Sequence, residues 1–122
     1  MVLQHGWAYG SKCTTLSNKI IFQALTGGGD DASYQKEGKN GVTIAELTSP
    51  FKAMARLCNM NCLPPYTVLG IHRGISENDI NAHAEDYRRT LIALRDETID
   101  LDKVHQYPYI NSDLDSVIGR SI

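Results

Sequence analysis

The sequence predicts a small α/β domain with a parallel sheet, and three observations support this fold class. An apolar run at 19–25 is rich in β-branched and aromatic residues, which is typical of a strand covered on both faces. A second strand pattern follows at 66–71. Between and after these strands lie two amphipathic helix patterns, the second one at 76–96. Strands that alternate with helices indicate a layered sheet with helices on its faces.

The first strand leads directly into a loop made of Thr26, Gly27, Gly28 and Gly29. Because glycine has no Cβ, the backbone of such a loop can approach a ligand closely. Ligands of open α/β sheets bind beyond the carboxyl ends of the strands, which is where this loop falls. The spacing matches neither G-x-G-x-x-G nor a P-loop. A simple turn is the alternative explanation of the glycines.

The segments on either side of this strand read as loops. Residues 5–18 are rich in turn formers but contain Trp7 and Tyr9, whose rings either fill a core or face a ligand. Residues 30–41 form a polar surface loop, and Tyr34 is its one large side chain.

Two helix starts are predicted after this loop. Thr43 and Glu46 have the spacing of a capping box, which predicts a short helical turn. Ser49 as N-cap and Pro50 at the first position predict a main helix that runs to Met60. One face of that helix is apolar and is expected to pack in the core: Phe51, Met54, Ala55, Leu57 and Cys58.

The second half of the chain contains one strong helix and a weakly patterned tail. Ser76 precedes the helix as its N-cap, and its apolar stripe is expected to dock on the sheet: Ile80, Ala84, Tyr87, Leu91 and Leu94. We take residues 1–97 as the domain and 98–122 as an extended tail with a short helix near 113–118. The apolar residues of the tail predict that it packs on another surface, with a second subunit as one candidate.

Composition restricts the function classes. The chain has 122 residues, which is enough for one domain, and a net charge of −2 with acids and bases interspersed, which argues against nucleic-acid binding. No apolar run is long enough for membrane insertion, and the first residues lack the features of a signal peptide. Three cysteines at irregular spacing do not indicate a disulfide framework, so we expect a cytoplasmic protein.

The sequence contains two partial metal-binding motifs, and neither predicts a metal site. Residues 83–85 match the H-x-E of zinc deaminases, but the P-C-x-x-C that completes that site does not follow. Cys13, Cys58 and Cys62 lack a fourth ligand for structural zinc. A cysteine–histidine nucleophile pair has no local signature here.

Four stretches together carry a family resemblance: HGWAYG at 5–10, TGGGDDASY at 26–34, SPFKAMARLCNM at 49–60 and LPPYTVLGIHR at 63–73. In that order and spacing, the chain resembles flavodoxin-like NAD(P)H:quinone oxidoreductases. It is most similar to the ancillary proteins of glutathione-gated potassium-efflux systems, with the modulator-of-drug-activity type close by. The resemblance covers nearly all of residues 3–96.

The resemblance implies a fold, a cofactor and partners. The fold would be a doubly wound sheet of five parallel strands in the order 2-1-3-4-5. FMN, with FAD as the alternative flavin, would bind at the strand carboxyl ends, accept a hydride from NAD(P)H and reduce a quinone. These enzymes work as homodimers. A potassium-efflux transporter is a further implied partner, which would place the protein in the cytoplasm beside the inner membrane.

The resemblance also implies which residues hold the flavin. Thr26, Gly28 and Gly29 would lie along the isoalloxazine, with Gly27 in the same cofactor-binding loop. Their backbone amides would face the polar edge of the ring and stabilise its reduced, anionic form.

Catalytic and substrate residues are implied in the same way. Tyr34 corresponds to a tyrosine beside the ring that settles charge during hydride transfer. Asn40 corresponds to a position where some relatives carry a histidine that partners the tyrosine, and asparagine supplies no imidazole for such a relay. Trp7, Ala8 and Tyr9 correspond to a loop that walls the substrate pocket, often across the dimer.

The match begins past the middle of the family pattern. The chain therefore resembles the C-terminal half of such an enzyme and lacks the FMN-phosphate loop, and we expect its sheet to be completed by oligomerisation. Two functions follow as hypotheses. One is an FMN-dependent NAD(P)H:quinone oxidoreductase that acts when the other half is supplied. The other is a non-catalytic regulatory or interaction module that no longer holds flavin.

Overall fold

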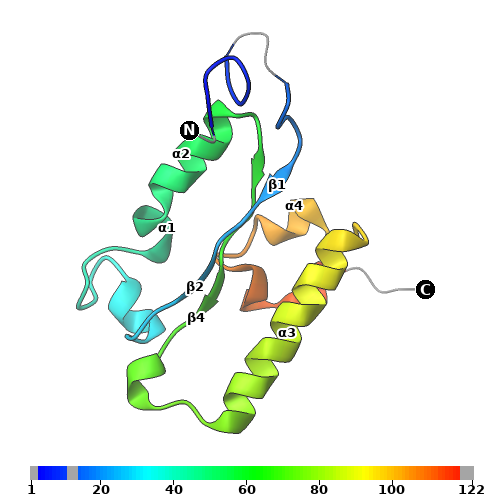
Figure 1. The fold of residues 1–122 in the computed structure, drawn as a ribbon. Helices are drawn as coiled ribbons and strands as arrows, with labels where there is room; N and C mark the ends of the chain where they lie inside the picture. The colour runs from blue at the N-terminus through cyan, green and yellow to red at the C-terminus, as the bar shows by residue number, and fades with distance from the viewer. Residues whose placement is uncertain (1–2, 11–13, 119–122) are drawn as a thin grey trace.

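The computed structural model describes residues 3–10 and 14–118, and Cys13 lies outside them. Its centre is a narrow parallel sheet between two helical layers (Figure 1). The helices α1 (Ile44–Leu47) and α2 (Ser49–Leu57) lie on one face, and the long helix α3 (Glu77–Arg95) lies on the other. The predicted α/β class is confirmed.

The sheet consists of two consecutive parallel ladders. Strand β1 (Ile20–Ile21) pairs with β3 (Asn61–Cys62), and β2 (Ala24–Thr26) pairs with β4 (Tyr66–Val68). Ile20 faces Asn61, whereas Ala24 faces Tyr66, so one extra residue lies between β3 and β4. Proline has no backbone N–H, so the pair at 64–65 cannot donate to a ladder, and the register shifts there.

The strand predictions need three corrections. The single strand predicted at 19–25 is interrupted where the register shifts, and β3 was not predicted because it precedes two prolines. The strand predicted at 66–71 ends at Val68. Gly70 then adopts a φ of 80°, which suits glycine, and the chain enters the 3₁₀ turn η2 (Ile71–Arg73).

The predicted helix starts are largely confirmed. Thr43 and Glu46 form the complete capping box of α1. Helix α2 begins one residue earlier than predicted, with Thr48 as N-cap, because the Ser49 hydroxyl donates to the Glu46 carbonyl at 2.9 Å. It ends at Leu57 rather than Met60. Ser76 caps α3 by accepting from the Asp79 amide at 3.1 Å.

Several helix residues predicted to be core are exposed. Phe51 and Leu57 on α2 are 47% and 56% exposed, and Ile80 and Leu91 on α3 are 50% and 44% exposed. Only Ala55 and Cys58 are fully buried on the α2 side. Two strands about 4.8 Å apart make a sheet narrower than the helices above it, so these side chains extend past its edge.

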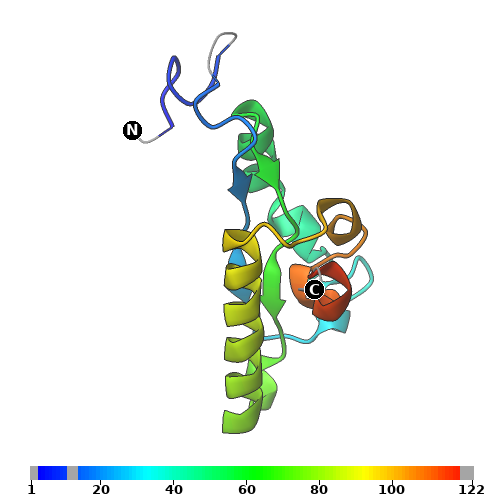
Figure 2. The ribbon, with the colours of Figure 1, turned by 90° about the vertical axis from the view of Figure 1, so that its right-hand side faces the viewer.

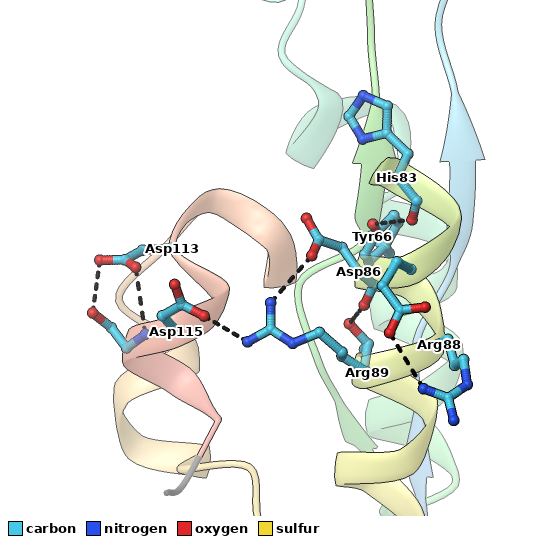
Figure 3. A network of polar contacts seen from close by, with 10 residues as sticks. Tyr66, His83, Asp86, Arg88, Arg89, Asp113 and Asp115 are labelled. Carbon is cyan, nitrogen blue, oxygen red and sulfur yellow. Dashed lines mark hydrogen bonds and ion pairs between the residues drawn. The ribbon is translucent and has the colours of Figure 1, made fainter. Parts of the chain in front are cut away.

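Tyr66 of β4 connects the sheet to α3 (Figure 3). The Tyr66 hydroxyl donates to the His83 carbonyl at 2.9 Å, and its ring meets Tyr87 edge to face at 5.1 Å. Burial, followed by the charge of Asp86, raises the pKa of Tyr66 to about 12, so this hydroxyl remains a donor at neutral pH.

The tail is folded rather than extended. It contains α4 (Leu101–Val104), the 3₁₀ turn η3 (Ile110–Ser112) and α5 (Leu114–Val117), which confirms the short helix predicted near 113–118. It lies beside β4 in Figure 2. Its apolar residues pack on Leu63 of the same chain and form the main core cluster: Val104, Ile110, Leu114 and Val117.

The tail also satisfies the backbone of β4. The Asn111 side chain accepts from the Thr67 amide at 3.0 Å and donates to the Thr67 carbonyl at 2.8 Å. The Ile110 amide donates to the Pro65 carbonyl at 3.0 Å. Side-chain and main-chain groups of the tail therefore take the place of a neighbouring strand at this edge.

The opposite edge, along β1 and β2, is open. The carbonyls of Lys19, Ile21 and Gln23 accept bonds from the β3–β4 side. In a parallel strand the intervening residues point their backbone groups to the other edge. Within 3–10 and 14–118, no strand pairs with that edge. None of the helices in these ranges is long and apolar enough to cross a membrane.

Candidate functional site

The glycine loop lies at the carboxyl end of β2 and is held by the loop that follows β4. The Gly27 amide donates to the Val68 carbonyl at 2.9 Å and so continues the ladder. The carbonyls of all three glycines then accept from the next turn: Gly29 from Gly70 at 2.7 Å, Gly27 from Ile71 at 3.3 Å and Gly28 from His72 at 3.1 Å. The two loops therefore form one unit at the expected ligand edge of the sheet.

Side chains of the same chain explain why these positions are glycine. None of the three is in the left-handed backbone region. A Cβ on Gly28 would lie 2.1 Å from the His72 ring, and one on Gly27 would lie 2.8 Å from the Tyr34 hydroxyl. Two rings thus pack directly on the loop backbone. The simple-turn alternative is insufficient, because each glycine accommodates a neighbouring side chain.

Tyr34 reaches the loop from the 3₁₀ turn η1 (Asp31–Tyr34). Asp30 caps this turn by accepting from the Ser33 amide at 3.1 Å and the Ser33 hydroxyl at 2.8 Å. Arg73 pairs with the other oxygen of Asp30 at 2.6 Å and links η1 to η2. The Ser33 hydrogen bonds, with a smaller contribution from Arg73, hold the pKa of Asp30 below its usual value.

The structure brings some of the predicted site residues together. Thr26, which is exposed, the glycines and Tyr34 share the carboxyl edge of the sheet. Asn40 is exposed and lies beside η1, because its backbone amide donates to the Ser33 carbonyl at 3.0 Å.

The aromatic loop of the predicted substrate pocket lies elsewhere. Both views place residues 5–10 near the amino end of β1, at the opposite end of the molecule from the glycine loop (Figures 1 and 2). Trp7 is 46% exposed, Ala8 is buried and Tyr9 meets His5 edge to face at 5.3 Å. Within one chain, Trp7, Ala8 and Tyr9 do not meet the site, and their role stays a prediction.

Three residues near the site were not predicted. His72 and Arg73 belong to a stretch that entered only as part of the resemblance, although their place after a strand was a usable signal. Tyr109 comes from the tail, and its hydroxyl donates to the Asp31 carboxylate at 3.0 Å. Nothing in the spacing of residues 78 positions apart could have indicated that contact.

Two hollows adjoin this edge. One, of about 290 Å³, lies between Tyr34, Ile44 and Tyr109. The other, of about 320 Å³, is apolar and lies between β2 and α3, with Ala24 and Tyr87 among its lining residues.

Metal and thiol chemistry find little support in the part of the chain that the structure describes. There, no three histidine, cysteine or acidic side chains are grouped as metal ligands. Burial raises the pKa of the Cys62 thiol, which disfavours the thiolate that a nucleophile needs.

A parallel sheet with helices on both faces and a glycine loop at its carboxyl edge is the architecture of open α/β domains, whose ligands bind at that edge. Residues 1–91 match the sequence profile of the family described as having the flavodoxin-like fold. The chain belongs to this family.

Named relatives agree with this assignment. The chain is 39% identical over 85 residues to the uncharacterized NAD(P)H oxidoreductase YrkL of Bacillus subtilis, covering 69% of this chain and 48% of YrkL. It is 33% identical over 92 residues to the glutathione-regulated potassium-efflux system ancillary protein KefF of Citrobacter koseri, covering 75% and 51%. The chain thus spans about half the length of the relatives that it matches.

A solved structure gives the same picture. General stress protein 14 of Treponema denticola, crystallised in complex with FMN, is 35% identical and superposes with a TM-score of 0.67, covering 76% of this chain and 52% of that protein. The comparisons support a flavodoxin-like oxidoreductase family.

Proposed function

We propose that this chain forms the C-terminal half of an FMN-dependent NAD(P)H:quinone oxidoreductase. The observation that carries the proposal is the glycine loop at the carboxyl edge of the sheet, with the Tyr34 hydroxyl packed on it. An FMN complex of a relative at 35% identity supports the cofactor, and the name of YrkL supports the NAD(P)H co-substrate.

The residues present fit the ring of the flavin. Thr26 is exposed, and Gly28 and Gly29 are partly exposed, so their backbone groups are accessible beyond the strand end. When bound, FMN supplies the hydride-accepting chemistry between NAD(P)H and a quinone. The loop would orient the ring and place amide dipoles at its polar edge, and the Tyr34 hydroxyl would donate a hydrogen bond where negative charge develops.

Asn40 has no imidazole, so we do not assign it a proton relay. His72 is the imidazole that contacts the loop, since its ring packs on Gly28. It is exposed, so it can also reach a bound molecule. Trp7, Ala8 and Tyr9 would serve the site of a second subunit, because the segment 5–10 that carries them lies at the other end of the molecule from the glycine loop.

The site would be completed on the open edge of the sheet. Alternate backbone groups of β1 and β2 have no strand partner there within the described residues, Ile20 is 41% exposed, and an apolar hollow lies nearby between β2 and α3. We propose that a parallel strand of the other half of a flavodoxin-like domain pairs with this edge and brings the phosphate-binding loop. The completed protein would act as a cytoplasmic homodimer.

A second function is supported by the likeness to KefF. The chain could serve as a non-catalytic module that associates with a potassium-efflux transporter and holds no flavin. The two proposals differ in one observable property, which is flavin binding.

The experiment is a fluorescence titration of FMN with the purified chain, alone and together with a polypeptide that carries the N-terminal half of the Treponema denticola relative. Stoichiometric quenching with the complementing half, followed by NAD(P)H:quinone turnover, supports the enzyme. An associated but flavin-free complex supports the module.

An edge variant provides the control. Ile20→Lys places a charge at the open edge, where it should prevent strand pairing while leaving the chain folded. Quenching that is equal for Ile20→Lys and the unchanged chain would contradict completion at this edge.

A further inference from the structure

The tail reaches the turn that carries Tyr34. The Tyr109 hydroxyl donates to Asp31 Oδ1 at 3.0 Å, and Asp31 and Tyr34 are the first and last residues of η1. The family match ends at residue 91, so this contact comes from a segment outside the match. An element that the family pattern does not cover therefore touches the candidate site.

Besides Tyr109, the turn η1 is held by the Tyr34 ring on Gly27 and by the Asn40 backbone amide, which donates to the Ser33 carbonyl. None of its residues is fully buried. Asp30 fixes its start, and a hollow of about 290 Å³ separates it from α1 and from Pro108 of the tail. The Tyr109 hydroxyl bridges this hollow. A turn held in this way depends strongly on each polar contact that it makes.

The tail, in contrast, is well anchored to the rest of the domain. Val104, Ile110 and Val117 are completely buried, and Asn111 holds the backbone of Thr67 on both its N–H and C=O sides. A second attachment joins the tail to α3 through the ion pair of Arg89 with Asp115, which Figure 3 shows. Tyr109 therefore projects from a base that is anchored on both the sheet and a helix.

We infer that Tyr109 is a positioning residue: it holds η1 so that the Tyr34 ring stays packed on Gly27. The role of Tyr34 in catalysis rests on the function proposed above, whereas the coupling of Tyr109 to Tyr34 does not. Burial, with a further contribution from Asp31, raises the pKa of Tyr109 to about 12, so the hydroxyl remains a donor at neutral pH. Tyr109 itself touches no reacting atom.

The test compares Tyr109→Phe with Tyr107→Phe in the full chain. Both substitutions remove one hydroxyl from the tail, but the Tyr107 ring packs against the core cluster, and its hydroxyl makes no hydrogen bond within the described residues. The first readout is amide hydrogen exchange. We expect Tyr109→Phe to speed exchange over 31–41 about five-fold or more and to leave 110–118 unchanged. Tyr107→Phe should change neither segment.

The second readout is the Tyr34 ring itself. In chain labelled with fluorotyrosine, the Tyr34 ¹⁹F resonance, assigned through Tyr34→Phe, should shift and broaden in Tyr109→Phe but not in Tyr107→Phe. Asp31→Asn keeps an oxygen acceptor and should give an intermediate shift. An unchanged Tyr34 resonance in Tyr109→Phe, or faster exchange spread equally over the tail, overturns the inference.

Flavin separates this inference from the proposed function. If the unchanged chain binds no FMN even with the complementing half, the proposed function fails, but the ¹⁹F and exchange results still decide the role of Tyr109. If FMN binds, Tyr109→Phe should lower turnover more than it weakens binding. Equal turnover of the two variants would contradict a positioning role.

Discussion

Along β4, the tail supplies hydrogen bonds and an apolar cluster, whereas along β1 and β2 the alternate backbone groups that point away from β3 and β4 meet no strand within the described residues. The first edge carries fully buried side chains such as Ile110, and the second carries Ile20, which is 41% exposed. The two edges of the sheet therefore have different properties. The covered edge carries the buried side chains that stabilise the fold, and the open edge has backbone groups that are available for pairing.

The largest difference between the edges should appear on truncation of matched isoleucines. Ile110→Ala removes a completely buried side chain from the core cluster and should lower the free energy of unfolding by about 3 kcal/mol. Ile20→Ala, at the open edge, should change it by less than about 0.5 kcal/mol. Urea unfolding measures both. Similar losses for the two variants would show that the open edge also contributes to the core.

A smaller effect is expected from the polar part of the covered edge. Asn111→Ala leaves the amide and carbonyl of Thr67, a residue only 5% exposed, without their partners, at a cost of about 2 kcal/mol. Asn111→Asp keeps the acceptor and should give an intermediate loss. Thermal unfolding of the three proteins tests this, and a loss in Asn111→Asp as large as that in Asn111→Ala would contradict the paired arrangement.

The glycine loop continues the open-edge strand, and its packing is tested by Gly28→Ala. The added Cβ meets the His72 ring, which must move, at a cost of about 1 kcal/mol because His72 is exposed and can swing outward. His72→Ala should relieve the conflict, so the double variant should be close in stability to His72→Ala alone. Additive losses in denaturant unfolding would show that His72 does not occupy this position.

The smallest effect concerns Asp30 at the carboxyl edge, which accepts hydrogen bonds from Ser33 and also pairs with Arg73. The pKa of Asp30 is lower in the folded chain than its usual value of 3.8. Asp30 therefore contributes stability above that value and loses the contribution as the pH falls through the folded pKa. Asn can still cap η1, so Asp30→Asn should be less stable at neutral pH and converge with the unchanged chain in acid. A constant difference from pH 7 to pH 2 would argue against this linkage.

Local patterns predicted the helices because their signals lie close together in the chain. The capping box of Thr43 and Glu46 and the Ser76 cap each involve residues three positions apart. The strand β3 was missed because its pairing depends on β1, some forty residues away, and because two prolines follow it. The tail was predicted to be extended, because no local sequence pattern indicates the Asn111 contact with Thr67 or the burial of Val104.

In the candidate site, too, features set by neighbouring residues were predictable and contacts between distant residues were not. The glycine loop at the end of a strand was predictable, and the resemblance added Tyr34. The packing of His72 on Gly28 and the bond from Tyr109 to Asp31 join segments that are distant in sequence, so only the three-dimensional structure reveals them. Exposure of Phe51 and Leu57 was also unpredictable, because an amphipathic pattern does not report how wide the underlying sheet is.

The Asn111 contact has a consequence for how large an assembly this chain can build. A sheet with two free edges can add strands without end and grow into a fibre. Here Asn111 bonds both backbone groups of Thr67, and the Ile110 amide bonds the Pro65 carbonyl, so β4 has no room for a further strand at these positions. We expect the tail to prevent strand addition along β4, while the edge of β1 and β2 stays available. Such an arrangement would limit self-association of the chain.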